Sequence, residues 1–296
     1  MTGPYDSNYP GSNDPYGQQY PGGPTGGYPG GFDNGYNGYN GGPYGMSQPG
    51  YGAGQFSPDA PQPTLAEAAN NQIDIGDSFT QAWRGFIATW VPWVLSALLF
   101  FAAAVIVSLV VLIPLLAAAL ADPDGSGGVS VGIFAGVGVI GFIAMLVLAV
   151  YAVVWQLNCW RNALRVVRGE SITFGDFFRL NGLGWPIVAE LVVTALCYVG
   201  LLLFVVPGLI IAFILMFVVP AMFILRDASI GNSFSLSWRV VSTQFGAAVL
   251  IFLVTWLLNF VGGLVVIGAL VTTPLMYLMI THALQRAIGG PLVQRA

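Results

Sequence analysis

Long apolar stretches after residue 90 indicate helices that cross a membrane. Two of them, at residues 90–121 and 129–157, are each long enough for one crossing. Two others, at residues 185–225 and 247–284, are too long for one. As a single helix the last would reach about 57 Å, whereas the hydrocarbon core of a bilayer is about 30 Å thick.

Proline and glycine interrupt both of the longer stretches near the middle. Residues 206–208 read Val-Pro-Gly in the first, and Gly262, Gly263 and Gly268 lie in the second. Because proline and glycine break helices, we expect each stretch to form a helical hairpin with almost no loop. The pattern therefore predicts six spans.

The positions of the basic residues predict the topology. All nine are arginines, and with six spans every one falls on the same side of the membrane. The other side receives residues 121–128 and two tight turns. Loops rich in arginine stay in the cytoplasm, so both termini are predicted to be cytoplasmic. A five-span arrangement would place Arg286 and Arg295 outside, and we reject it.

A ten-residue sequence recurs before the first and the fifth predicted spans. Residues 75–84 and 230–239 match at most positions, and residues 174–179, before the third span, form a shorter copy. Glycine permits a turn in each copy, and we expect the following Asp77 or its equivalent Asn232 to cap a helix.

Aromatic side chains in these copies recur at helical spacing and share one face. We expect each copy to be an amphipathic helix on the cytoplasmic leaflet, with arginine in reach of anionic lipid. The candidate lipid-interface residues are Phe79, Trp83, Arg84, Phe234, Trp238 and Arg239. These helices either gather lipids or only anchor the hairpins. The predicted fold class is all-α: a polytopic membrane helix bundle of three units, each an interfacial helix plus a transmembrane hairpin.

The first 60 residues differ in composition from the rest. They hold 17 glycines, nine tyrosines and four of the 13 acidic residues, but no arginine, leucine, isoleucine or valine. Such a chain buries too little aliphatic surface to offset its backbone entropy. We predict a disordered Gly/Pro/Tyr-rich cytoplasmic tail at 1–66, a six-span membrane domain at 67–288 and a short cytoplasmic C-terminal tail at 289–296. The N-terminal tail is either a multivalent interaction arm or a solvated spacer.

The composition excludes a soluble monomer and offers little for catalysis. The 296 residues are 56% hydrophobic and 7% charged, with one histidine and two cysteines. Residues 76–79 resemble the serine block of a lipase-like hydrolase family, but those enzymes need an aspartate three residues before the catalytic histidine, where Met279 precedes His282. We expect no enzyme activity, no catalytic, cofactor or metal site, and membrane lipids rather than nucleic acid as partners.

Polar side chains inside the predicted spans are candidate sites because they are costly there. Glu190 lies five residues after Trp185, so it either snorkels to the interface, pairs with an arginine, or handles protons or substrate. Asn259 lies near mid-membrane and needs a partner helix, while His282 is expected at the inner interface. With Thr194, these residues are the candidate polar intramembrane set.

Residues 207–211, 219–222 and 226–239 resemble the membrane domain of bacterial membrane-anchored glycerophosphoryl diester phosphodiesterases. The resemblance covers residues 70–288. In that family a soluble catalytic barrel follows, and since this chain ends at Ala296 we expect no activity to carry over. With its tail, the protein is similar to the proline- and glycine-rich transmembrane proteins of mycobacteria and their relatives, which implies an actinobacterial inner membrane.

Two functions are consistent with these features. The first is a non-enzymatic inner-membrane interaction or assembly factor in envelope biogenesis, whose tail recruits protein partners. The alternative is a transporter or lipid-handling protein with a path between the hairpins. Partner identity and oligomeric state do not follow from these residues.

Overall fold

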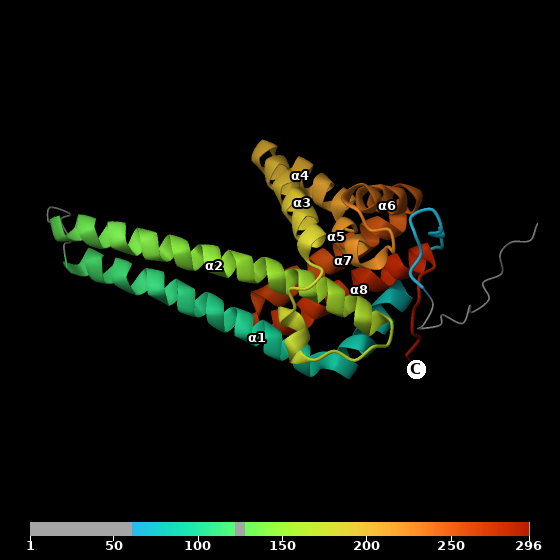
Figure 1. Ribbon diagram of the computed structural model, residues 1–296, viewed down its shortest axis with the longest axis horizontal. Coiled ribbons are helices and arrows are strands. Elements are labelled where there is room, and N and C mark those ends of the chain that lie inside the picture. The colour runs from blue at the N-terminus through green and yellow to red at the C-terminus, as the bar shows by residue number, and fades with distance from the viewer. Residues whose placement is uncertain (1–60, 122–127, 296) are drawn as a thin grey trace, which may run out of the picture. The chain divides into compact units, whose positions relative to one another are not determined.

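The computed structural model describes residues 61–121 and 128–295. The expected disorder of residues 1–60 concerns a segment outside these ranges. The described residues form helices and no strand, which confirms the all-α class (Figure 1). The elements are α1 (Ile75–Ala121), α2 (Gly128–Val167), the 3-10 helix η1 (Phe174–Phe178), α3 (Gly184–Leu203), α4 (Val205–Leu215), α5 (Val218–Ile224), α6 (Ile230–Thr243), α7 (Phe245–Leu264) and α8 (Val266–Ile288).

Six segments of the described chain are long and apolar enough to cross a membrane, as expected from the hydropathy pattern. They are Ile75–Ala117, Gly138–Val167, Gly184–Leu203, Val205–Ile224, Phe245–Leu264 and Ile267–Ile288. The protein is therefore a multi-pass membrane protein.

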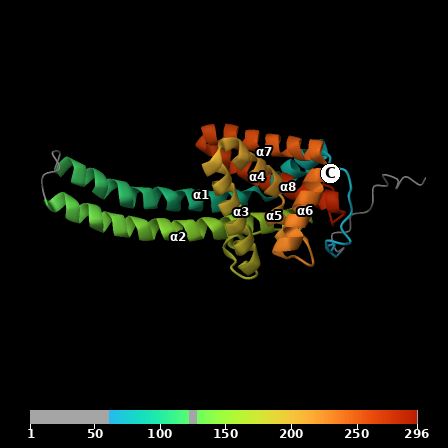
Figure 2. The same ribbon diagram turned by 90° about the horizontal axis from the view of Figure 1, so that it is seen from above.

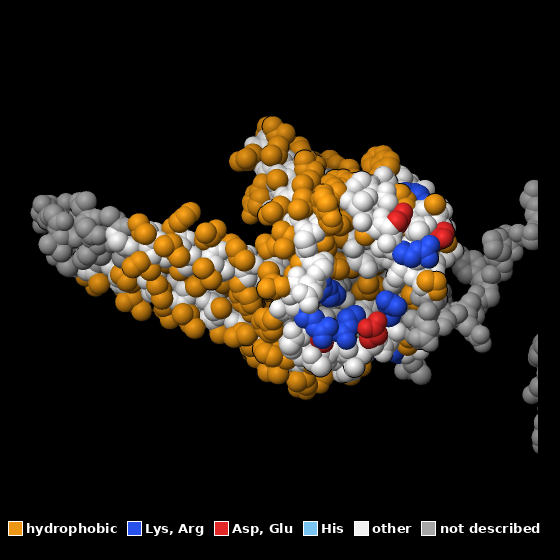
Figure 3. Space-filling model, viewed as in Figure 1, with side chains coloured by type: hydrophobic (Ala, Val, Ile, Leu, Met, Phe, Trp, Pro, Cys, Tyr) orange, Lys and Arg blue, Asp and Glu red, His pale blue; other side chains and the backbone are white. Residues whose placement is uncertain are grey.

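The spans form three helical hairpins, α1 with α2, α3 with α4, and α7 with α8 (Figures 1 and 2). Helix α8 also packs against α1 and α2, where the Tyr277 ring lies 4.5 Å from that of Trp160 and 6.4 Å from that of Trp93. Away from this core the apolar side chains face outward, as Phe142 does with 71% of its surface exposed. Figure 3 shows this apolar surface along the α1–α2 hairpin, where it suits a hydrocarbon environment.

The two shorter hairpins each turn on one non-helical residue. Phe204 (φ −166°, ψ 160°) separates α3 from α4, and Val265 (φ −123°, ψ 112°) separates α7 from α8. The first break lies before the predicted position at 206–208, because Pro207 fits within the first turn of α4, where the backbone N–H needs no partner inside the helix.

Glycine pairs let the arms of these hairpins approach closely beside each turn. A methyl group on Gly200 would lie 2.8 Å from Cα of Gly208, and one on Gly268 would lie 2.8 Å from the carbonyl oxygen of Gly262. Small residues serve the same purpose generally where membrane helices pack. Both hairpins are thus built in the same way.

Each copy of the repeated sequence forms a helical element before a span. These elements are the first turns of α1, which end at the non-helical Thr89, then η1, and then α6. The buried face carries small side chains, among them Ser78 and its equivalent Ser233, both fully buried. The repeat therefore defines a packing face as well as an aromatic one.

The observed helix caps lie three residues before the predicted ones, so this prediction is wrong. The Asp74 carboxylate accepts a hydrogen bond from the Asp77 amide (2.9 Å), and the Ser229 hydroxyl accepts one from the Asn232 amide (3.1 Å). Asp77 instead pairs with Arg286 on α8. The Asn232 side chain likewise turns away from the helix start and donates to Asp227 (2.8 Å and 3.0 Å), so in both copies the side chain three residues after the cap binds elsewhere.

Charged side chains gather at the end of the bundle opposite the tip of the α1–α2 hairpin (Figure 3). The residues after α8 belong to this end and pack on the bundle. Leu292 is fully buried, and the amides of Val293 and Arg295 donate to the Val167 carbonyl (3.1 Å) and the Gln81 side chain (3.0 Å). The expected C-terminal tail does follow the end of α8, but through residue 295 it is part of the packed domain.

Candidate functional site

Residues 63–73, which we call the strap, connect the N-terminal tail to α1 and lie against α6 and the end of α8. Arg239 on α6 donates from its two terminal nitrogens to the carbonyls of Leu65 and Ala68, each at 3.2 Å. Its planar guanidinium suits this double contact, which a lysine cannot reproduce. The chain is therefore bound before the predicted tail boundary at residue 66.

Further hydrogen bonds hold the rest of the strap. The Gln244 side chain accepts from the Ile73 amide and donates to the Asn71 carbonyl, both at 2.7 Å. The Ala69 amide donates to the Ile288 carbonyl at 3.0 Å, in the last turn of α8, where carbonyls lack helical partners. The attachment point of the tail is thus fixed at the arginine-rich end.

Equivalent arginines of the two good repeat copies bind the two terminal segments. Arg239 holds the strap, and Arg84 donates to the main-chain carbonyl of Arg295. We expected both to reach anionic lipid. Arg239 uses both terminal nitrogens on strap carbonyls, whereas Arg84 uses one terminal nitrogen and its side chain stays exposed, so its other N–H groups remain in reach of lipid. In both copies the equivalent arginine therefore binds the backbone of a terminal segment.

The aromatic residues of the same copies remain available to lipid. Phe79, Trp83 and Trp238 are 40%, 42% and 60% exposed, and Phe234 is half-buried. Exposed tryptophan at the end of a span is typical of the membrane interface. The aromatic part of the lipid-interface prediction is therefore consistent with the structure.

Glu190 faces another hairpin inside the membrane domain. Its carboxylate accepts from the Gln156 side chain on α2 (2.8 Å) and from the Thr194 hydroxyl one turn along α3 (3.4 Å), and the residue is 8% exposed. It therefore neither snorkels freely nor pairs with an arginine. Sequence reasoning missed Gln156, although a glutamine within an apolar span is itself a signal.

The other two intramembrane candidates lie elsewhere. The Asn259 amide donates to the Thr255 carbonyl of its own helix at 2.9 Å. His282 is buried, and its Nδ1 lies 3.2 Å from the Ser78 hydroxyl on α1. The four candidates thus occupy three separate places and do not line one path between the hairpins.

The Ser78–His282 contact has the wrong surroundings for nucleophilic catalysis. Ser78 donates to the Asp74 carbonyl (2.7 Å), both side chains are closed off from the surface, and Asp77 is paired with Arg286. A catalytic triad needs an accessible nucleophile and a carboxylate that orients the histidine. The contact instead joins α1 to α8. In the described ranges no three His, Cys, Asp or Glu side chains come together as metal ligands.

Asp176 in η1 organises the third, shortened copy. Its side chain, 2% exposed, lies 2.9 Å from Arg165 and 2.7 Å from Arg179, and accepts from the Thr173 amide at 2.7 Å. Burial raises the pKa of this carboxyl, but hydrogen bonds from Thr173 and the Arg165 cation outweigh it and hold the pKa below its ordinary value. We did not predict this cluster, because its arginines come from different segments.

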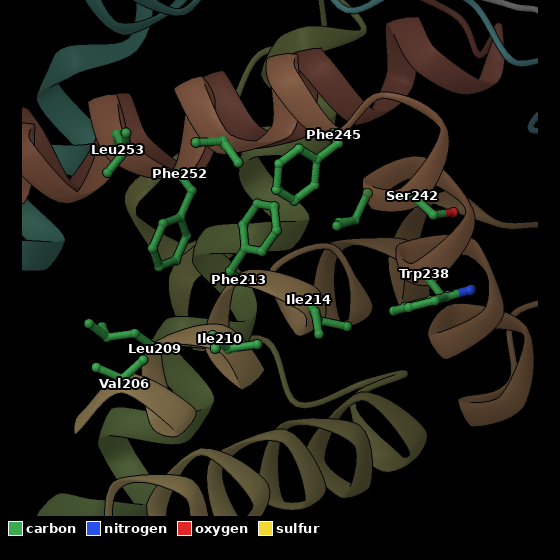
Figure 4. A pocket seen from close by; sticks show the side chains of 12 residues that line it. Val206, Leu209, Ile210, Phe213, Ile214, Trp238, Ser242, Phe245, Phe252 and Leu253 are labelled. Atoms are coloured by element: carbon green, nitrogen blue, oxygen red, sulfur yellow. The ribbon is translucent and has the colours of Figure 1, made fainter. Parts of the chain in front are cut away.

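An apolar groove of about 640 Å³ lies between α4, α6 and α7 (Figure 4). Its walls are aliphatic and phenylalanine side chains, and the phenylalanines come from α4 and α7. The Phe213 ring lies 5.8 Å from that of Phe245 and 5.6 Å from that of Phe252. Trp238 and Ser242 of α6 lie at one end, and Val206 and Leu253 lie toward the other.

Comparison with known proteins identifies mycobacterial relatives. The chain is 30% identical over 156 residues to uncharacterized proteins of Mycobacterium bovis and of Mycobacterium tuberculosis strain CDC 1551, and 29% identical to one of strain H37Rv. Each match covers 52% of this chain and 47% of the relative, so the chain spans about half the length of the curated relatives it matches. No family model and no solved structure matches the chain.

Proposed function

We propose that the protein is a non-enzymatic membrane anchor that displays its Gly/Pro/Tyr-rich tail at the cytoplasmic face of a bacterial inner membrane, where the tail recruits protein partners in envelope biogenesis. The strap carries this proposal. Because Arg239 and Gln244 bind its backbone, the tail leaves the domain from a fixed point on the arginine-rich end. Arginine-rich segments remain in the cytoplasm, which supports the orientation.

Three further observations support the same assignment. Regularly spaced tyrosines in the tail are suited to many weak contacts. The mycobacterial relatives agree with an actinobacterial inner membrane. The resemblances to proline- and glycine-rich transmembrane proteins and to the membrane domain of membrane-anchored phosphodiesterases fit the role of a membrane anchor. The separation of Glu190, Asn259 and His282 gives no support to a transport path.

Co-purification tests the tail directly. Deletion of residues 1–60 leaves the strap and all six spans, so we expect normal membrane insertion but loss of the proteins that co-purify with the full chain. A full-length variant with the nine tail tyrosines changed to serine keeps the length and charge of the tail and is expected to lose the same partners. An unchanged partner set after the deletion would refute the proposal.

A further inference from the structure

We propose that the groove between α4, α6 and α7 binds one acyl chain of a membrane phospholipid, with the lipid headgroup at the Trp238 end. This binding site goes beyond the proposed role of the tail. Leu209, Ile210 and Leu253 line the groove and are each 42–52% exposed, so the groove is open to its surroundings. Since α4 and α7 are membrane spans, those surroundings are hydrocarbon.

The distribution of polar groups along the groove matches that of a lipid. Eleven of the twelve lining residues are apolar or aromatic, and the exception, Ser242, lies at the α6 end beside Trp238 (Figure 4). Indole rings favour the headgroup level of a bilayer. The groove therefore has one interfacial end and an apolar remainder.

The interior of the groove suits an acyl chain, which needs only dispersion contacts from its surroundings. Phe213 on α4 packs edge-to-face with Phe245 and Phe252 on α7, with ring centroids 5.8 Å and 5.6 Å apart. Together with the aliphatic side chains these rings line an apolar space of about 640 Å³. A transmembrane helix of a partner or of a second copy is the competing occupant, and crosslinks between two protein chains would reveal it.

Photocrosslinking of retained lipid tests the site. The full-length protein is reconstituted in vesicles of phosphatidylethanolamine and phosphatidylglycerol that carry a diazirine on one acyl chain. It is then solubilised, passed through gel filtration to remove loosely bound lipid, and irradiated. We expect the modified peptides to come from α4, α6 and α7. Equal labelling of the exposed α1–α2 hairpin, or crosslinks between two protein chains in place of lipid, would overturn the proposal.

Paired substitutions on α7 make the test specific. Val249 lines the groove, whereas the neighbouring Leu250, 51% exposed, does not. Val249→Trp is expected to lower crosslinking about tenfold, equivalent to about 1.4 kcal/mol of binding free energy, while Leu250→Trp leaves it unchanged. Leu209→Trp fills the groove from the opposite wall if Val249→Trp does not fold. Undiminished crosslinking in a folded groove variant would contradict the assignment.

Discussion

Replacing Asp176 with alanine is expected to lower the free energy of unfolding by about 3 kcal/mol, one of the two largest effects we predict. The substitution leaves Arg165 without its buried partner and removes the carboxylate that accepts from the Thr173 amide. Removing one partner of a buried pair costs about 3–5 kcal/mol. We expect the lower end, because Arg179 is 61% exposed and Arg165, 26% exposed, keeps its pair with Glu170.

Thermal unfolding of the purified protein in detergent measures this loss. Glu170→Ala is the matched control, since Glu170 also pairs with Arg165 but is 43% exposed, and we expect it to cost less than about 1 kcal/mol. The pKa of Asp176 is lowered in the folded state, so its stabilisation is complete above the ordinary value near 3.8 and is lost as the pH falls through the folded value. The difference between wild type and Asp176→Asn should therefore shrink in acid. Equal losses for Asp176→Ala and Glu170→Ala would contradict this account.

Gly268→Ala is expected to destabilise the α7–α8 hairpin by about 1–3 kcal/mol, the usual cost of overpacking. The added methyl group would lie 2.8 Å from the carbonyl oxygen and 3.0 Å from Cα of Gly262. Both atoms belong to the backbone and cannot rotate away. In the α3–α4 hairpin, a methyl group on Gly200 would lie 2.8 Å from Cα of Gly208. We therefore expect Gly200→Ala to cause a similar loss of stability.

Gly263→Ala is the control for this prediction. Gly263 lies in the same turn region, but a methyl group there meets nothing within 4 Å. Alanine favours helix over glycine, so this variant should be as stable as wild type or slightly more so. The comparison uses the midpoint of thermal unfolding in one detergent. Similar midpoints for Gly263→Ala and Gly268→Ala would show that close approach of the arms is unimportant.

Features set by local sequence could be predicted, and features set by long-range packing could not. Hydropathy and chain breakers placed six spans correctly, because the length of a span follows from the thickness of the bilayer. One break was predicted at residues 206–208 but lies at Phe204, because Pro207 fits the first turn of α4 and does not interrupt it.

The polar contacts depend on partners distant in the chain. Gln156 meets Glu190 across two hairpins, and Ser78 meets His282 from opposite ends of the membrane domain. Nothing in the neighbouring sequence of either pair indicates the other member. The strap was not predicted for a similar reason. Its backbone is bound by the side chains of Arg239 and Gln244, which are more than 170 residues away in the sequence.

The orientation of the membrane domain is the central claim, and cysteine labelling tests it most directly. In a variant with Cys159 and Cys197 replaced by alanine, single cysteines are placed at Ser47, Asn181 or Phe204. Asn181 lies at the arginine-rich end, where its carbonyl accepts a hydrogen bond from Arg161, and Phe204 is the exposed turn between α3 and α4. A membrane-impermeant maleimide should label only Phe204→Cys in right-side-out vesicles, and only Ser47→Cys and Asn181→Cys in inverted vesicles. Labelling of Asn181→Cys and Phe204→Cys from the same side, or of Ser47→Cys from outside, would contradict the account.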